Sequence, residues 1–496
     1  MAISLAAGTI CGKMSFGCGG KPAVNENRMN KELSDFATRV LPLLRDTAWQ
    51  ARDDAFNELA IELFALQFKY NPAYQKICRA RKVTPECLEH WTQIPAVPTA
   101  SFKELELTCL PPGERTAVFH SSGTTEQKPS RHFHCPESLA VYEASSWKWF
   151  EVHILRSADG TSANSRKRGQ AGRAPFAMIC LTPPPAQAPR SSLVHMFETI
   201  RRCSVGCPQP KVAPGTAHAT SSAFVGKLAA DGSWALDFDT ALAALNSSLV
   251  TRHASLLLGT AFSFVHLLDF LEEKDLRFDL PADSRVMETG GYKNRSRTMP
   301  KEELHALITE RLGIPLENIV CEYGMSELSS QAYDRVTGGS VLPHPGPLAK
   351  ERENGSQSVD ETTVAGNFNE RSLLFPLPEG EGQGEGKRAV KSRSFHFPPW
   401  ARVQIVSPET GREVAEGETG LVHVSDLANV FSVAVIQTED LAIRRGDGFE
   451  LIGRAQMAEP RGCSLMMNEP LASTLRSTAT EDGPSLSPPG GERVRG

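Results

Sequence analysis

The stretch from Phe119 to His134, FHSSGTTEQKPSRHFH, groups small hydroxyl residues around a glycine. Backbone N–H groups in a glycine-containing turn, together with serine and threonine hydroxyls, can surround phosphate oxygens. The residues that would form such a cradle are Ser121, Ser122, Gly123, Thr124 and Thr125, with Lys128 as a further candidate contact. The G-x-x-x-x-G-K-[ST] spacing of P-loop NTPases is absent. By itself the stretch therefore indicates either another kind of phosphate-binding loop or an ordinary flexible loop.

Charged residues that suit a bound nucleotide follow this stretch in order. Glu327 ends EYGMSE, which follows an apolar run, so we expect it at the carboxyl end of a strand, where ligands bind in open α/β sheets. A carboxylate at that edge can hold Mg²⁺ against phosphate oxygens. Asp440 in QTEDLA suits ribose hydroxyls, and Arg454 follows Gly453 at a predicted domain junction. The ordered set favours the phosphate-binding interpretation.

The elements that must position these residues are readable from the hydrophobic pattern. Helical spacing of apolar residues predicts two or three helices between residues 30 and 71. Four short apolar runs predict strands, at Phe176–Thr182, Ala254–Ala261, Ser284–Gly291 and Asn318–Gly324. In the stretch KEELHALITERLG between the last two runs, Leu304, Ile308 and Leu312 share one helix face. Alternating strands and helices indicate an α/β domain with a largely parallel sheet, and the run from Ala401 to Leu427 predicts a β-hairpin.

The composition is that of an ordinary globular protein and excludes several classes. The 496 residues carry a formal net charge of −5, without the basic excess of a nucleic-acid-binding protein. No apolar run is long enough to cross a bilayer. Eleven cysteines without a C-x-x-C pair or a compact Cys/His cluster argue against a disulfide framework or a structural zinc site. This cysteine pattern favours the reducing cytoplasm.

Three stretches differ in composition from the rest of the chain. Residues 156–174 form a basic polar segment, residues 342–394 are rich in Pro, Gly and Glu, and the tail echoes the second stretch. We expect the second stretch and the tail to be disordered and to take no part in the chemistry. The predicted division is a disordered extension at 1–28, a large domain at 29–430 with inserted loops at 156–174 and 342–394, a short C-terminal portion at 431–470 and a disordered tail at 471–496.

The ordered motifs resemble those of the acyl-adenylate-forming superfamily, whose members carry [ST]-S-G-T-T-G, Y-G-x-[ST]-E, T-G-D and G-R. Several further stretches are similar to the acyl-protein synthetase (LuxE) family: IPAVPTASFK, LTPPPAQAPRSSLVHM, ETGGYK, CEYGMSELSSQAYD, IQTEDLA and RGCSL. Outside the insertions, the resemblance extends from Met29 to Leu465. It implies a large N-terminal adenylate-forming domain of α/β class, with mixed or parallel sheets and helices, followed by a short C-terminal portion.

The resemblance also implies a two-step ligase reaction that uses ATP and Mg²⁺. A fatty acid is converted to acyl-AMP and pyrophosphate, and the acyl group then moves to a cysteine thiol. The position of that acceptor in the family matches Cys463, whose thiolate neighbouring Arg461 would favour. An acyl-reductase subunit would then receive the acyl group.

The remaining site residues come from the same resemblance. The hydroxyl-rich loop would hold the pyrophosphate end of ATP, and Glu327 would be both catalytic and metal-binding. Lys128 departs from the superfamily pattern, in which the lysine follows the proline rather than preceding it. The other residues expected at the nucleotide are Gly290, Gly291, Tyr323, Gly324, Asp440 and Arg454. For Tyr323 the alternative is simple packing, and for the two glycines of ETGG it is a plain turn.

Two other functions fit many of the same motifs. Coenzyme A ligases of the phenylacetate type share most of them, but they carry a C-terminal domain with a catalytic lysine, for which the residues after Arg454 leave little room. The second alternative is an inactive nucleotide-binding remnant, disabled by the two insertions. Surface loops tolerate long insertions at modest entropic cost, which favours the active enzyme.

Overall fold

The computed structural model describes residues 31–46, 53–121, 128–155, 176–205, 222–230, 233–290, 299–335, 337 and 393–455. The N-terminal extension, residues 156–174, residues 342–392 and the tail lie outside these residues, so the disorder expected of the extension, the second stretch and the tail stays a prediction. Among the described residues, no helix combines the length and apolar character that a membrane crossing requires.

Three helices open the described chain, and the first two lie within residues 30–71, where the helical spacing predicted two or three. They are α1 (Lys31–Arg45), α2 (Asp53–Tyr70) and α3 (Pro72–Ala80). Asn71 begins α3, because its side chain accepts a hydrogen bond from the backbone N–H of Tyr74 and Pro72 follows at the first helical position. The short elements that come next are η1 (Pro85–Cys87), η2 (Trp91–Gln93), β1 (Val97–Pro98), α4 (Ser101–Glu104) and η3 (Pro112–Glu114).

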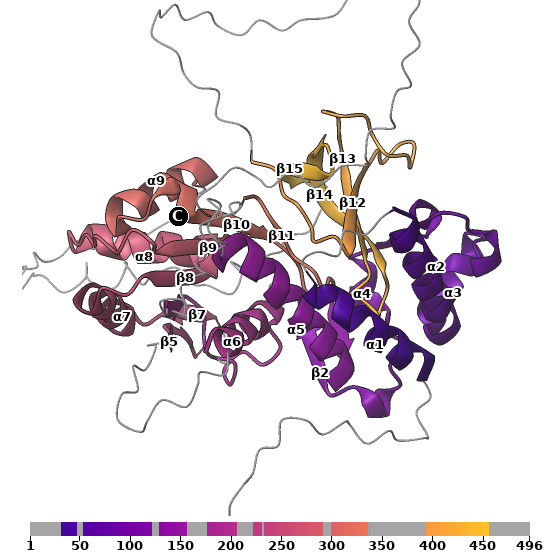
Figure 1. Ribbon diagram of the computed structural model, residues 1–496, viewed down its shortest axis with the longest axis horizontal. Coiled ribbons are helices and arrows are strands. Elements are labelled where there is room, and N and C mark those ends of the chain that lie inside the picture. Colours follow the sequence, from indigo (N-terminus) through magenta and orange to yellow (C-terminus); the bar gives the residue numbers. More distant parts are fainter. Residues whose placement is uncertain are drawn as a thin grey trace, which may run out of the picture.

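A six-stranded sheet forms one half of the molecule (Figure 1). Its strands are β4 (Ala177–Cys180), β5 (Ser222–Phe224), β8 (Ser255–Thr260), β9 (Arg285–Thr289), β10 (Ile319–Tyr323) and β11 (Ala332–Tyr333). The order is β11-β10-β9-β8-β4-β5, and only β11 runs antiparallel to its neighbour. The strand order therefore reverses between β4 and β8, and the carboxyl edge near such a reversal is the usual ligand site. The four strands predicted from the apolar runs are all present.

Helices cover both faces of this sheet and make a three-layer α/β unit. The strands alternate, so that Ile179, Leu257 and Val286 pack on one face. That face is covered by α7 (Phe238–Thr251), α8 (Ala261–Glu273) and α9 (Lys301–Leu312). Met178, Leu256 and Met287 face the other side. There lie α5 (Pro136–Phe150), its π-helical continuation η4 (Glu151–Leu155) and α6 (Ser192–Val205).

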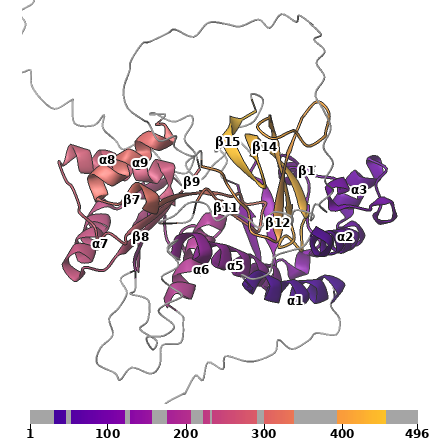
Figure 2. The same cartoon turned by 45° about the horizontal axis from the view of Figure 1, so that its top comes forward.

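An antiparallel sheet forms the second half. It consists of β12 (Ala401–Val406), β13 (Thr419–Asp426), β14 (Val435–Arg445) and β15 (Gly448–Arg454), with β1 parallel to β14. The predicted hairpin is the β12–β13 pair. Both views place α5 between this sheet and the parallel sheet (Figures 1 and 2). The expected α/β fold with mixed sheets is confirmed.

The remaining elements are β2 (Ala117–His120), β3 (Arg131–His134), β6 (Gly226–Leu228), β7 (Trp234–Leu236) and η7 (Leu316–Asn318).

Two of the domain boundaries predicted from the sequence fall within regions that the structure describes as packed. Residues 431–455, assigned to the C-terminal portion, contribute β14 and β15 to the same sheet as β12 and β13. A separate C-terminal unit thus stays a prediction for the residues beyond 455. Arg393 and Ser394, the last residues of the expected inserted segment 342–394, are described, and Arg393 contacts the parallel sheet. The packed structure therefore resumes two residues earlier than expected.

Candidate functional site

The hydroxyl-rich stretch is the connection of a β-hairpin. Strands β2 and β3 pair antiparallel, from Ala117 opposite His134 to His120 opposite Arg131. Ser121 then closes the neck of the connecting loop: its N–H donates to the carbonyl of Ser130 at 3.4 Å, and its Oγ accepts from the N–H of Ser130 at 3.0 Å. The tip of the loop, with the predicted phosphate contacts Ser122, Gly123, Thr124 and Thr125, lies outside the described residues.

Lys128 forms an exposed ion pair with Glu104 of α4. Its Nζ is 3.0 Å from Oε2 of Glu104, and both side chains are more than half exposed. An exposed ion pair of this kind adds little to stability and does not fix the lysine in place. A contact between Lys128 and phosphate stays a prediction.

The neck of the hairpin contacts the loop that carries Glu327. The Oγ atoms of Ser130 and Ser326 are 3.4 Å apart, although 196 positions separate them in the chain. Nδ1 of His132 donates to the carbonyl of Ser326 at 2.7 Å, and burial lowers the pKa of His132, which keeps the ring neutral. The Ser326 hydroxyl in turn donates to Oε2 of Glu327 at 2.9 Å. Two motifs that the sequence linked only by their order therefore share one set of hydrogen bonds.

Glu327 is the predicted metal ligand, and its surroundings fit that role. It follows the carboxyl end of β10 and is buried beside the hairpin neck. Among the described residues, no group of three His, Cys, Asp or Glu side chains lies close enough to hold a metal ion by itself. Mg²⁺ in nucleotide-using sites is commonly bound by one or two carboxylates together with substrate phosphates, so a single carboxylate beside a loop predicted to bind phosphate is compatible with a Mg²⁺ site.

A small cluster of polar side chains lies where β15 ends beside β14, and it consists of Asp440, Tyr323 and Arg454. Asp440 lies opposite Arg454 in the β14–β15 ladder. The Arg454 Nε donates to Oδ1 of Asp440 at 3.1 Å, and the Tyr323 hydroxyl donates to Oδ2 at 2.9 Å. Burial raises the pKa of Tyr323 well above its ordinary value, so the hydroxyl stays protonated and can donate. Each Asp440 oxygen keeps a second lone pair, so a ribose hydroxyl can still be accepted there.

The ring of Tyr323 is enclosed by other aromatic side chains. It meets Phe449 edge to face at 5.2 Å between ring centroids, and Phe395 and Phe397 are about as close, at 6.0 and 6.2 Å. This environment fits the alternative that the ring packs in the core. Stacking of Tyr323 against adenine stays a prediction.

Two predicted site glycines directly follow strands, and a different local constraint favours glycine at each position. Gly290, directly after β9, has a φ of +35°, which favours glycine, and the space around a Cβ there is open. At Gly324, directly after β10, a Cβ would meet the Glu322 carboxylate, so only glycine fits without movement. Gly291 lies outside the described residues.

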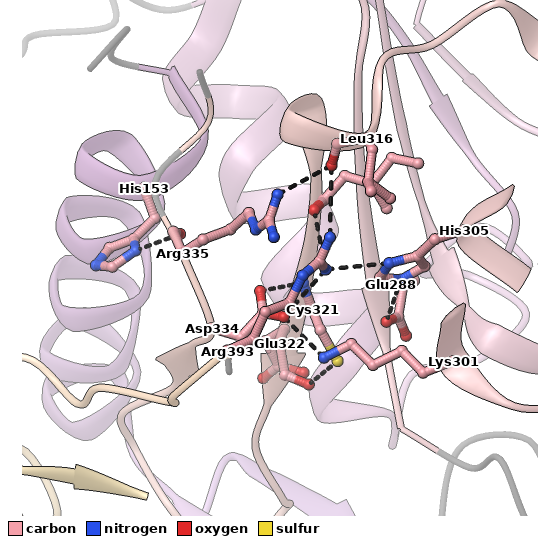
Figure 3. A network of polar contacts seen from close by, with 11 residues as sticks. His153, Glu288, Lys301, His305, Leu316, Cys321, Glu322, Asp334, Arg335 and Arg393 are labelled. Atoms are coloured by element: carbon pink, nitrogen blue, oxygen red, sulfur yellow. Dashed lines mark hydrogen bonds and ion pairs between the residues drawn. The ribbon is translucent and has the colours of Figure 1, made fainter. Parts of the chain in front are cut away.

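A buried polar network that was not predicted from the sequence lies at the edge of the parallel sheet (Figure 3). Asp334 is fully buried, accepts from the N–H of Cys321 at 2.8 Å, and pairs with Lys301 at 2.7 Å and Arg393 at 3.2 Å. Burial by itself would raise the pKa of Asp334, but the two cations hold it below its ordinary value. Arg393 also donates to His305 at 3.0 Å.

This network ties the chain after the long insertion to β10. Nε2 of His305 is 3.1 Å from Oε1 of Glu288 on β9. Glu288 and Asp334 both belong to stretches quoted for the family resemblance, ETGGYK and CEYGMSELSSQAYD. That membership was the signal in the sequence that could have marked them.

The described cysteines include several that are poorly suited to accept an acyl group. Burial raises the pKa of Cys78 to about 11 and raises the pKa values of Cys109, Cys180 and Cys321 further. A thiol in such an environment is rarely the reactive thiolate. Cys463, the predicted acceptor, lies outside the described residues.

Comparison with known proteins gives a short sequence match and a broader structural one. No family model matches the chain. The long-chain-fatty-acid–luciferin-component ligase of Aliivibrio fischeri is 33% identical over 81 residues, which are 14% of this chain and 21% of that protein. The match thus spans about a fifth of the relative's length.

Among solved structures, an open conformation of 2-hydroxyisobutyryl-CoA ligase in complex with 2-HIB-AMP and CoA aligns with a TM-score of 0.50. The alignment covers 83% of this chain and 76% of the ligase at 13% identity. A second structure of that ligase, in the postadenylation state, gives a TM-score of 0.49 at 12% identity, over 83% of this chain and 70% of the ligase. The protein therefore has the fold of the adenylate-forming ligases.

Proposed function

We propose that this protein is an ATP-dependent ligase that activates a fatty acid as acyl-AMP and then carries the acyl group as a thioester on Cys463. The observation that supports the first step best is the contact of Ser130 and His132 with Ser326, beside Glu327. It brings the neck of the hydroxyl-rich loop next to a buried carboxylate at the carboxyl edge of a parallel sheet. The short match to a fatty-acid ligase supports the choice of substrate.

In the adenylation step, a carboxylate oxygen of the fatty acid attacks the α-phosphorus of ATP. The bond from that phosphorus to the oxygen bridging to the β-phosphate breaks, and pyrophosphate leaves. We assign the loop at 121–125 to the pyrophosphate end, and Asp440 to the ribose hydroxyls. Glu327 would hold Mg²⁺, which offsets negative charge on the phosphate oxygens when bound.

In the transfer step, the Cys463 thiolate attacks the acyl carbon, the carbon–oxygen bond to AMP breaks, and AMP leaves. The raised pKa values of the buried cysteines described above support an acceptor elsewhere in the chain. Arg454, beside the positive-φ Gly453, lies at the end of the described sheet and 9 positions before Cys463 in the sequence. An acyl-reductase subunit in the cytoplasm is the proposed recipient of the acyl group.

The test combines two measurements on the full chain with ATP, Mg²⁺ and a labelled fatty acid. Exchange of labelled pyrophosphate into ATP reports the first step, and intact mass reports acylation of the protein. The Cys463→Ser variant should retain exchange and lose acylation. Cys87→Ser, which changes an exposed described cysteine, should keep both.

The outcomes separate the three functions considered for this chain. Product that forms only with free coenzyme A would show a coenzyme A ligase and contradict the internal acceptor. A folded protein that gives no exchange with any fatty acid would be a nucleotide-binding remnant. Acylation that persists in Cys463→Ser would move the acceptor to another residue.

A further inference from the structure

The loop at residues 326–330 carries Glu327 and is held by two side chains, Asp426 at the end of β13 and Asn429 in the β13–β14 connection. Asp426 accepts from the N–H of Ser329 at 3.0 Å through Oδ2 and from the Ser330 hydroxyl at 2.8 Å through Oδ1. Asn429 donates to the carbonyl of Glu327 at 3.0 Å and accepts from the Ser329 hydroxyl at 3.2 Å. The main chain on the C-terminal side of the Glu327 side chain is therefore fixed by partners about a hundred positions further along the chain, 97 for the Ser329–Asp426 bond.

A third side chain holds the loop at the residue before Glu327. His132 on β3 donates to the carbonyl of Ser326, so its bond lies one residue before Glu327. We call His132, Asp426 and Asn429 the loop clamp. All three are almost completely buried, with exposed fractions of 3%, 1% and 1%. Their bonds to Ser326, Glu327 and Ser329 are thus shielded from competing water.

The loop clamp rests on the packed core. Gln67 of α2 donates to the carbonyl of Asn429 at 2.8 Å and accepts from the N–H of Ala434 at 2.8 Å. The N–H of Leu427 donates to the carbonyl of Trp400 at 3.0 Å, and the Trp400 indole donates to Ser145 of α5 at 2.9 Å. Side chains whose supports are buried in this way keep a functional group within a narrow range of positions.

The chemistry of Asp426 argues for a positioning role. It is a fully buried carboxylate whose two oxygens accept from Ser329, Ser330 and the N–H of Ala428, all of them neutral donors. Burying a carboxylate costs free energy that such bonds offset only in part. Burial accordingly raises the pKa of Asp426 to about 6. A neutral side chain would pack there at lower cost, so the carboxylate is explained better by what it holds than by stability.

We propose that Asp426, with Asn429 and His132, positions Glu327 against the neck of the hydroxyl-rich loop, so that metal-assisted adenylation depends on residues that do not touch the substrate. This inference rests on the proposed function, because it assigns the metal carboxylate to Glu327. Groups that orient metal ligands in other proteins change metal affinity or activity by about 10- to 100-fold when they are removed.

The test uses Asp426→Asn and Asn429→Ala in the full chain. In Asp426→Asn one oxygen becomes an NH₂ group, which cannot accept the bond from Ser329 or Ser330. We expect the pyrophosphate exchange rate to fall about 10-fold or more and the Mg²⁺ concentration for half-maximal exchange to rise. Acylation from added, preformed acyl adenylate should stay within about twofold of wild type, because it bypasses the metal-dependent step.

Ser284→Ala is the matched control. It also removes a buried hydrogen-bond acceptor, the partner of the Ser255 N–H at 2.9 Å, but at the amino end of the parallel strands. It should change neither exchange nor its Mg²⁺ dependence. If Asp426→Asn does not fold, Asn429→Ala gives the same readouts. The proposal is overturned if a folded clamp variant keeps wild-type exchange, or if exchange and acylation from acyl adenylate fall together.

Binding of ATP with Mn²⁺ separates failure of this inference from failure of the proposed function. If the wild-type protein shows no pyrophosphate exchange, the proposed ligase function is refuted. Weaker binding of Mn²⁺–ATP by Asp426→Asn than by wild type would still support the positioning role of the loop clamp. Equal binding by the two proteins, or a wild type that does not bind Mn²⁺–ATP, overturns it.

Discussion

Replacing Glu322 by glutamine should change how the stability of the protein depends on pH. Glu322 ends the buried strand β10, and burial, with added repulsion from Glu288, raises its pKa from 4.5 to about 7 although the Thr289 hydroxyl donates to it. Between these two pH values the folded protein binds more protons at this site than the unfolded chain. The free energy of unfolding therefore falls as pH rises through this window, and the loss is complete above pH 7.

The size of the effect follows from the shift. A difference of about 2.5 pH units corresponds to about 3 kcal/mol. In Glu322→Gln the side chain is neutral at every pH, and its amide oxygen can still accept from Thr289. The free energy of unfolding of the variant, relative to wild type, should thus increase by about 3 kcal/mol between pH 4.5 and pH 8.

Urea unfolding of both proteins across this range measures the difference directly. Glu104→Gln serves as the control, because that carboxylate is 70% exposed and its ion pair with Lys128 adds little to stability. A flat difference for Glu322→Gln would show that Glu322 titrates as an ordinary carboxyl group and would refute the reasoning.

Two further substitutions test predicted site residues. Tyr323→Phe removes the buried hydroxyl that donates to Asp440, so urea unfolding should show a loss of about 1–2 kcal/mol; an unchanged stability would mean that the bond contributes nothing. Lys128→Ala should change the free energy of unfolding by less than about 0.5 kcal/mol, because it removes only an exposed ion pair. The ATP concentration for half-maximal exchange should rise in the same variant, and an unchanged ATP dependence would remove Lys128 from the phosphate site.

The fold could be predicted as far as local pattern determines it. The buried faces of α1 and α9 repeat at helical spacing, and β8 and β10 are short apolar runs, so their type was readable from neighbouring residues. The pairing of β1 with β14 was not, because nothing near Val97 indicates a partner more than three hundred positions away. Long-range pairing depends on the complete core rather than on a local signal.

The candidate site shows the same limit. Motif order linked the loop after Phe119 with Glu327, but the bond between His132 and Ser326 joins residues whose sequence contexts give no hint of each other. Asp426 is the last residue of β13, just before the turn toward β14, and its sequence context is that of a turn residue, because aspartate is common in turns for local reasons. Burial distinguishes an aspartate that holds the Glu327 loop from an ordinary turn aspartate. The burial of a single polar residue cannot be read from one sequence.

The most direct test of the proposed chemistry is pyrophosphate exchange into ATP by wild type and by Glu327→Gln, with and without a fatty acid. We expect wild type to exchange only when both fatty acid and Mg²⁺ are present. We expect Glu327→Gln to lose most of this exchange while it still accepts an acyl group from preformed acyl adenylate. Exchange that is independent of fatty acid, or that is undiminished in Glu327→Gln, would contradict the assignment of this site.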